Sequence, residues 1–158
     1  MRMAKEPRLV VVSNRLPVAL EKNGDSQRLK PGSGGLVTAL TPILKDRGGI
    51  WIGWLGTTET LSIRQLRTIL GPASEEWGFR LYPVLLSDEE VEQFYYGFAN
   101  EVLWPLFHDL QTRCRFDPAY WRSYVAVNAK YARVVARHTQ EDDLVWIHDY
   151  HLMGLSAA

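Results

Sequence analysis

A cluster of titratable side chains follows the last apolar run of the chain. Leu144-Val145-Trp146-Ile147 is typical of a buried strand, and His148-Asp149-Tyr150-His151 comes directly after it. Open parallel sheets place their ligand sites at the carboxyl ends of their strands. The segment could therefore hold a metal, bind a polar ligand or transfer protons, or it could form a structural hydrogen-bonded cluster.

Side-chain alternation weakens the metal interpretation. In an extended segment, His148 and Tyr150 would face one side and Asp149 and His151 the other. No cysteine or second carboxylate cluster stands nearby in the sequence to complete a coordination shell. A structural cluster and polar ligand binding or acid–base chemistry remain the open alternatives.

A glycine-rich turn and an arginine could together bind a phosphate. Gly32-Ser33-Gly34-Gly35 precedes apolar residues at helical spacing, so backbone N–H groups and the positive helix end could face an anion. The spacing matches neither a Walker A motif nor the dinucleotide fingerprint. Arg15 follows the first apolar run, and a guanidinium can hold a phosphate through two charge-assisted bonds. A plain flexible turn and a solvated surface arginine are the alternatives.

Tryptophan is frequent in the chain, with six residues. Large aromatic side chains usually belong to the core. Trp51, Trp54 and Trp104, however, stand beside glycine or proline at expected element ends. A ring in such a place can face a ligand, and the flat C–H face of a sugar is one that it could serve.

The elements that position these residues alternate along the chain. We expect four strands, at 8–12, 50–54, 79–86 and 144–147. We expect four helices, from the glycine turn to Gly48, at 60–70, from 88 through 95 or beyond, and from 118 to about 138. Asn23-Gly24 predicts a hairpin within 18–29. The alternation predicts an α/β fold, a Rossmann-like parallel sheet with helices on both faces.

Composition bounds the class of protein. The 158 residues, 46% of them hydrophobic, can bury one sizeable core, so we expect one domain or part of one. Eighteen basic and 18 acidic residues are scattered evenly, which argues against a nucleic-acid partner. No apolar run is long enough to span a membrane or to form a signal peptide. The single Cys114 favours a reducing, cytoplasmic setting.

Taken together, several collinear segments resemble the trehalose-6-phosphate synthases, which are retaining glucosyltransferases of the GT-B fold in glycosyltransferase family 20. The resemblance covers nearly the whole chain and corresponds to the first part of that family's N-terminal Rossmann-like domain. It implies that 1–158 is a partial, acceptor-side domain and that a C-terminal donor-binding domain is absent. The matching segments are 11–17 (VVSNRLP), 34–36 (GGL), 51–54 (WIGW), 94–96 (FYY), 100–108 (NEVLWPLFH) and 146–152 (WIHDYHL).

The resemblance implies a reaction and a set of site residues. Glucose would pass from UDP-glucose to glucose 6-phosphate with retention, giving trehalose 6-phosphate and UDP, with no metal or other cofactor. Asp149 would hold acceptor hydroxyls near the reaction centre and serve as the catalytic residue. Arg15 would bind the phosphate of glucose 6-phosphate. The acceptor pocket would be shaped by Trp54, Tyr95 and Trp104, and the donor diphosphate would meet Gly34 and Gly35.

The partners implied are these two small molecules, with neither nucleic acid nor membrane, and the full-length enzyme could form a homo-oligomer. Because the donor-binding half is missing, we expect the 158 residues alone to be inactive. Two alternatives stay open. One is a non-catalytic module that binds a sugar phosphate or a partner domain, and the other is a sister glycosyltransferase such as a glucosylglycerol-phosphate synthase.

Overall fold

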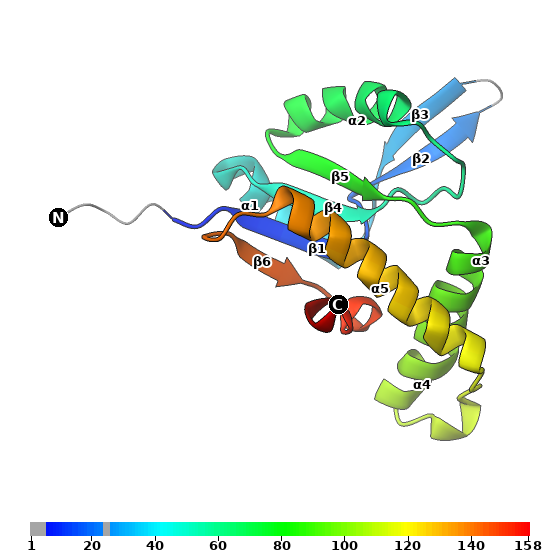
Figure 1. Ribbon diagram of the computed structural model, residues 1–158. Coiled ribbons are helices and arrows are strands. Elements are labelled where there is room, and N and C mark those ends of the chain that lie inside the picture. The colour runs from blue at the N-terminus through cyan, green and yellow to red at the C-terminus, as the bar shows by residue number, and fades with distance from the viewer. Residues whose placement is uncertain (1–5, 24–25) are drawn as a thin grey trace.

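The computed structural model describes residues 6–23 and 26–158. Its centre is a four-stranded sheet in the order β5-β4-β1-β6, with all neighbouring strands parallel. Helices cover both faces of this sheet (Figure 1). The predicted parallel α/β fold is therefore confirmed. The strands are β1 (Leu9–Arg15), β4 (Ile50–Trp54), β5 (Arg80–Val84) and β6 (Leu144–Ile147).

The two middle strands explain why the chain folds around them. β1 is apolar over residues 9–12, β4 is apolar apart from Gly53, and all residues of both strands except Arg15 are buried. Such continuous apolar runs suit parallel strands, because both faces of a parallel sheet are covered. Alternate residues of β1 enter different cores: Leu9 and Val11 face one, and Val10 and Val12 face the other.

One face of the sheet is covered by α1 (Gly35–Arg47) and α2 (Ile63–Trp77). Leu40 and Leu44 of α1 and Leu70 of α2 are buried in this core. The sequence correctly placed α1 between the glycine turn and Gly48. It was wrong about where α2 ends, since the helix runs through Gly71-Pro72 instead of ending at Leu70.

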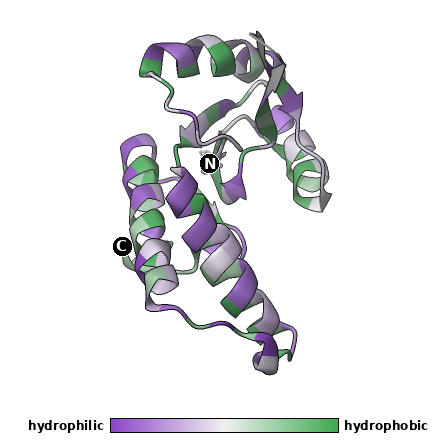
Figure 2. Ribbon diagram, turned by 90° about the vertical axis from the view of Figure 1, so that its right-hand side faces the viewer, coloured by the Kyte–Doolittle hydropathy of each residue, from purple (hydrophilic) through white to green (hydrophobic). Residues whose placement is uncertain are grey.

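The other face is covered by α5 (Pro118–His138) and by a continuous helical stretch before it. That stretch comprises α3 (Asp88–Glu90), the π-helix η1 (Val91–Leu103) and α4 (Trp104–Phe107). The predicted capping box is present, because the Ser87 side chain accepts a hydrogen bond from the Glu90 N–H and Glu90 accepts one from the Ser87 N–H. Figure 2 shows hydrophilic and hydrophobic residues side by side along the helices, as expected where only one side packs inward.

A small hairpin and a few short turns complete the fold. β2 (Val18–Asn23) pairs antiparallel with β3 (Ser26–Pro31), which confirms the predicted hairpin, although Gly24 of its turn lies outside the described residues. The Leu20 N–H donates to the Leu55 carbonyl, and this bond attaches the hairpin to the end of β4. The short 3-10 helices are η2 (Gln111–Arg113), η3 (Tyr150–Leu152) and η4 (Leu155–Ala157).

β6 differs from its prediction as a buried strand. It pairs with β1 on one side only, so it forms an edge of the four-stranded sheet. Leu144 is 52% exposed and Trp146 is 46% exposed. The apolar run fits a strand position with two covered faces, but only one of them is covered here. Among residues 6–23 and 26–158, no helix is both long and apolar enough to cross a membrane.

Candidate functional site

Aromatic rings surround the guanidinium of Arg15 at the carboxyl edge of the sheet. Arg15 is the last residue of β1, and Trp54 is the last residue of the neighbouring β4. The Arg15 Cζ lies 4.6 Å from the centroid of the Trp54 ring and 5.6 Å from that of Tyr95 on η1. Guanidinium groups at such distances are attracted to ring faces by about 0.5–1 kcal/mol at exposed sites. The fold thus brings together three residues that the family resemblance assigned to one pocket.

A local irregularity of β1 aims Arg15 at these rings. The register with β4 pairs Val12 with Ile52 and then Arg15 with Trp54, so β1 holds one extra residue between the two pairs. Such a bulge bends a strand and redirects the side chains that follow it. Gly53 stands opposite the bulge, and a Cβ there would lie 2.6 Å from the Arg15 carbonyl carbon. Only glycine fits, because the backbone of β1 occupies that space.

Buried hydrogen bonds hold the bulge in place. The Trp51 indole N–H donates to the Ser13 hydroxyl oxygen at 2.8 Å, and the Ser13 hydroxyl donates to the Arg15 carbonyl at 2.7 Å. From the other face, the Tyr131 hydroxyl donates to the Asn14 carbonyl at 2.6 Å. Trp51 is fully buried, so it is a support for this segment, and the expectation that its ring could face a ligand was wrong.

Asp149 occupies a turn that strand alternation could not have predicted. β6 ends at Ile147, and Asp149 has a φ of 75°, which only a few per cent of non-glycine residues adopt. Its Oδ1 accepts the N–H of Tyr150 at 2.7 Å and so caps η3. The premise of an extended segment through His151 was therefore wrong. The carboxylate remains partly open to solvent, since its side chain is 40% exposed.

Sequence reasoning placed His151 in the titratable cluster but assigned it no individual role. Its ring stacks on Tyr150, with centroids 4.3 Å apart, and on Tyr95, with centroids 5.6 Å apart. Its Nδ1 lies 3.4 Å from the Asp149 Oδ2, and neither ring nitrogen has a hydrogen-bond partner within the described residues. Burial lowers the pKa of His151, against the opposing charge of Asp149, so the ring is neutral at pH 7.

The rings therefore form one continuous series that links the phosphate-binding candidate to the carboxylate. Trp54 and Tyr95 contact the Arg15 guanidinium, Tyr95 stacks on His151, and His151 lies beside Asp149. Buried polar atoms without partners are rare and call for an explanation, such as a group that binds later. The imidazole nitrogens of His151 are two such atoms in the interior of this site.

Trp104 stands at the border of the site. It begins α4, is 41% exposed and stacks on His108, with ring centroids 4.2 Å apart. Phe107 of the same helix meets Tyr150 edge-on at 6.1 Å, so α4 lies beside η3. The ring contact of Trp104 itself is with His108 and not with the ring series.

The glycine turn lies at the same edge as Arg15. The Gly32 N–H donates to the Pro17 carbonyl at 2.7 Å, two residues after Arg15. Gly34 caps α1 with a φ of 138°, and a Cβ on Gly34 or Gly35 would meet no atom within 4 Å. The space beside these glycines is thus open at the start of α1, where the partial positive charge of a helix start favours an anion.

The clustering of metal-ligating side chains can be read from the structure. No group of three or more histidine, cysteine, aspartate or glutamate side chains is placed to hold a metal ion in the described part of the chain.

The roles of Gly53, Ser13 and His151 in this site were missed from sequence. A glycine inside a strand pattern is itself a sign of close backbone approach, and it could have identified Gly53.

The parallel α/β sheet holds Arg15 and the glycine turn at its carboxyl edge, where open sheets of this kind bind their ligands. The family model of glycosyltransferase family 20 matches residues 7–158, and the chain belongs to this family. Among its relatives are trehalose-6-phosphate synthases of the GT-B fold.

Curated relatives are identical to the chain at more than two fifths of the aligned positions. The trehalose-6-phosphate synthase of Mycolicibacterium smegmatis is 44% identical over 144 residues, which are 90% of this chain and 27% of the relative. The bifunctional trehalose-6-phosphate synthase/phosphatase of Thermoproteus tenax is 43% identical over 155 residues, 92% of this chain and 20% of the relative. The chain therefore spans between a fifth and 27% of the length of these relatives.

Solved structures agree with the fold. A Burkholderia xenovorans alpha,alpha-trehalose-phosphate synthase (UDP-forming) in complex with glucose-6-phosphate matches with a TM-score of 0.68 at 28% identity, over 95% of this chain and 30% of that one. A trehalose-6-phosphate structure from E. coli bound with UDP-2-fluoro glucose matches with a TM-score of 0.71 at 31% identity, over 95% of this chain and 29% of that one.

Proposed function

We propose that the protein containing this chain transfers glucose from UDP-glucose to glucose 6-phosphate with retention, giving trehalose 6-phosphate and UDP. In this proposal the 158 residues are the acceptor side of a two-domain cleft, and the donor-binding domain lies outside them. The observation that carries the proposal is the Arg15 guanidinium, which sits over two aromatic rings and has no carboxylate partner among the described side chains.

An unpaired guanidinium on aromatic rings suits a sugar phosphate. Arg15 would bind the phosphate through parallel charge-assisted bonds, each worth about 1.5–3 kcal/mol when partly desolvated. The rings of Trp54 and Tyr95 hold the guanidinium from the sides, so little side-chain entropy is lost on binding. Trp54 and Tyr95, together with Trp104 at the border, would line the pocket of the acceptor sugar.

The carboxylate and the helix start would then act on the reacting groups. Asp149 would accept hydrogen bonds from acceptor hydroxyls, and its capped turn fixes one oxygen and leaves the other for the sugar. Gly34 and Gly35 at the start of α1 would approach the donor diphosphate, because no side chain blocks it there. The uncharged His151 would support Asp149 from the interior.

The reaction needs neither a metal nor an enzyme nucleophile. The bond from the sugar C1 to the diphosphate oxygen breaks, a bond from C1 to the acceptor hydroxyl oxygen forms on the same face, and the hydroxyl proton passes to the leaving diphosphate. The protein contributes orientation of two phosphorylated partners and stabilisation of the developing charge. The relatives support this assignment, since the B. xenovorans structure holds glucose-6-phosphate and the E. coli structure holds UDP-2-fluoro glucose.

The test is release of UDP from UDP-glucose by the full-length protein and, separately, by the 158-residue chain. We expect the full-length protein to release UDP with glucose 6-phosphate as acceptor, and the isolated chain to release none. Glycerol 3-phosphate and glucose serve as alternative acceptors. A preference for glycerol 3-phosphate would identify a sister glycosyltransferase, and turnover by the isolated chain would contradict the two-domain assignment.

A further inference from the structure

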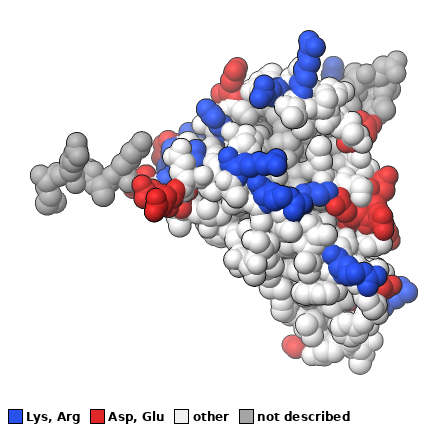
Figure 3. Space-filling view, viewed as in Figure 1, with Lys and Arg blue, Asp and Glu red and all other residues white. Residues whose placement is uncertain are grey.

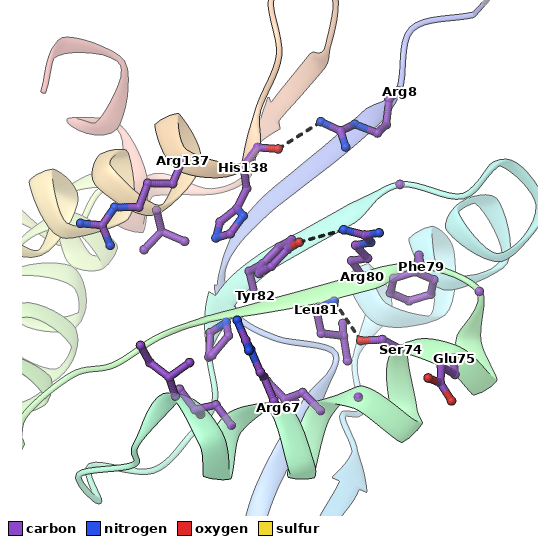
Figure 4. Close-up of a pocket in the computed structure, with 18 of the residues that line it drawn as sticks. Arg8, Arg67, Ser74, Glu75, Phe79, Arg80, Leu81, Tyr82, Arg137 and His138 are labelled. Atoms are coloured by element: carbon purple, nitrogen blue, oxygen red, sulfur yellow. Dashed lines mark hydrogen bonds between the residues drawn. The ribbon is translucent and has the colours of Figure 1, made fainter.

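A second cavity lies far from the Arg15 site, toward the opposite edge of the sheet. It is a groove of about 1280 Å³ between α2 and α5 that crosses the edge strand β5 (Figure 4). Its walls come from the amino-terminal half of the sheet, including Arg8 before β1 and Gly49 before β4. No residue assigned to the acceptor or donor site lines it. Any ligand here would therefore be additional to the proposed substrates.

Arginines from separate elements surround this groove. They are Arg8 before β1, Arg67 on α2, Arg80 at the start of β5 and Arg137 near the end of α5, with Glu75 as the one lining carboxylate. Arg8 is neutralised by two bonds to Asp143. Among the described side chains, none of the other three has a carboxylate partner. The groove therefore carries three free guanidinium groups against one carboxylate.

The excess of positive charge in the groove is local, since the whole chain has a formal net charge of zero. On the face shown in Figure 3, basic side chains cross the middle of the molecule, and acidic ones gather mainly toward its ends. The pKa of His138, which also lines the groove, is affected by the same positive charges. Burial lowers the pKa of His138 first, and the charges of Arg137 and Arg80 lower it further.

The arginines reach the groove from different elements. Figure 4 shows Arg67 rising from α2 toward β5, where Arg80 and Tyr82 stand. The Arg80 guanidinium is 3.5 Å from the Tyr82 hydroxyl, and the Tyr82 ring stacks on His138 with centroids 3.6 Å apart. The stacked pair of Tyr82 and His138 thus lines the groove together with Arg80 and Arg137.

The outer edge of β5 offers no free N–H donors, which limits what the groove can bind. The Arg80 N–H points inward and donates to the Gly49 carbonyl, so the N–H groups of positions 81 and 83 would point outward. The Leu81 N–H is bound by the Ser74 hydroxyl, and Pro83 has no N–H. A partner adding a strand would find no donors. On β5, the hydrogen-bond donors left to a ligand are therefore those of the side chains.

We propose that this groove binds a phosphate-bearing small molecule through Arg67, Arg80 and Arg137. Three guanidinium groups against one carboxylate leave about two positive charges, which matches an anion of at least two negative charges. Arginine forks fit the oxygens of phosphate groups in pairs. The groove volume exceeds that of a lone ion and is above the roughly 300–1,000 Å³ that is usual for small-molecule sites.

The test is calorimetric titration of the full-length protein with inorganic pyrophosphate at low salt, followed by titration with a nucleoside diphosphate. Arg67→Gln and Arg80→Gln are each expected to weaken pyrophosphate binding by about tenfold, the loss of one charge-assisted contact. Arg64→Gln is the matched control, because Arg64 is an exposed residue of the same helix that does not line the groove. The control should change the affinity by less than about twofold.

An Arg15→Gln variant separates the groove from the acceptor site. Groove binding should survive in this variant. Nucleoside diphosphate binding that Arg67→Gln weakens would identify a nucleotide as the source of the phosphate, because no residue assigned to the donor site lines the groove. Absence of saturable binding by the wild-type protein would overturn the proposal. It would also be overturned if Arg15→Gln alone abolished binding, or if Arg64→Gln weakened binding as much as the groove variants.

Discussion

An arginine stands at each end of β1, and the two meet opposite kinds of neighbour. Arg8, just before the strand, donates to Asp143 through its Nε at 2.9 Å and through a second nitrogen at 2.5 Å. Arg15, at the end of the strand, rests on aromatic rings and has no carboxylate partner in the described chain. The first charge is used to join β1 to the loop before β6, and the second is kept available for a ligand.

The contrast teaches how one strand separates stability from function. A bidentate arginine–carboxylate pair is geometrically satisfied and gains nothing from a further anion. Rings attract a guanidinium without neutralising it, so its hydrogen-bond donors stay free. The bulge between Val12 and Arg15, with Gly53 opposite it, lies at the functional end.

The largest expected effect comes from removing the free charge. Arg15→Gln in the full-length protein should weaken glucose 6-phosphate binding by about 100-fold, because two charge-assisted bonds to the phosphate are lost. Arg8→Gln should leave this affinity within about threefold of wild type, since Arg8 lies at the far end of the strand. Titration calorimetry measures both. Equal losses in the two variants would remove the functional distinction between the ends of β1.

The next effect comes from filling the space that the bulge occupies. Gly53→Ala forces a Cβ to within 2.6 Å of the Arg15 backbone, so it should lower the free energy of unfolding by about 1–3 kcal/mol and also weaken glucose 6-phosphate binding. Gly71→Ala is the control, because a Cβ there meets no atom within 4 Å and an alanine favours the helix by about 0.5–1 kcal/mol. Denaturant unfolding of both variants measures these changes in the free energy of unfolding. A harmless Gly53→Ala would contradict the close approach of β1.

Removing the paired charge should have a smaller effect, and on stability alone. Arg8→Gln leaves the carboxylate of Asp143, whose side chain is only 4% exposed, without its partner, so the free energy of unfolding should fall by about 1–2 kcal/mol. Arg47→Gln removes the pair with the 77%-exposed Glu6 side chain and should cost less than about 0.5 kcal/mol. Similar values for the two variants would show that the Arg8 pair adds nothing beyond a surface contact.

The smallest expected effect is a pH dependence at the functional end. Burial holds the pKa of His151 below its ordinary value of 6.5, so the folded state takes up a proton less readily than the unfolded state. Stability should therefore be full above pH 6.5 and fall as the pH drops toward the folded-state pKa. His151→Phe keeps a ring and cannot be protonated, so its unfolding free energy should decline less over this range. An unchanged slope would leave the pH dependence to other groups, such as His138, whose pKa burial also lowers.

Sequence patterns predicted the elements well where local chemistry decides them. The β-branched run of β1, the Ser87 capping box and Asp117-Pro118 all begin elements at the expected places. Gly71-Pro72 suggested a helix end that the structure does not have, since packing of α2 on the sheet outweighs the local penalty. The apolar β6 looked buried, because a run of apolar residues does not reveal whether both faces are covered.

The candidate site was predictable by residue type more than by geometry. Arg15, Trp54 and Tyr95 were assigned to one pocket and lie together. The turn at Asp149 has a backbone conformation that no local pattern signals, and it invalidated the alternation argument. The stacking of His151 between two tyrosines depends on η1 and η3 meeting in space, and this is a tertiary fact.

The central claim is that Arg15 recognises a phosphate group of the acceptor. The most direct test measures the affinities for glucose 6-phosphate and for glucose in the wild-type full-length protein and in Arg15→Gln. The account predicts that the substitution removes most of the preference for the phosphorylated sugar and leaves the weak glucose affinity nearly unchanged. A substitution that weakened both sugars equally, with the preference intact, would contradict it.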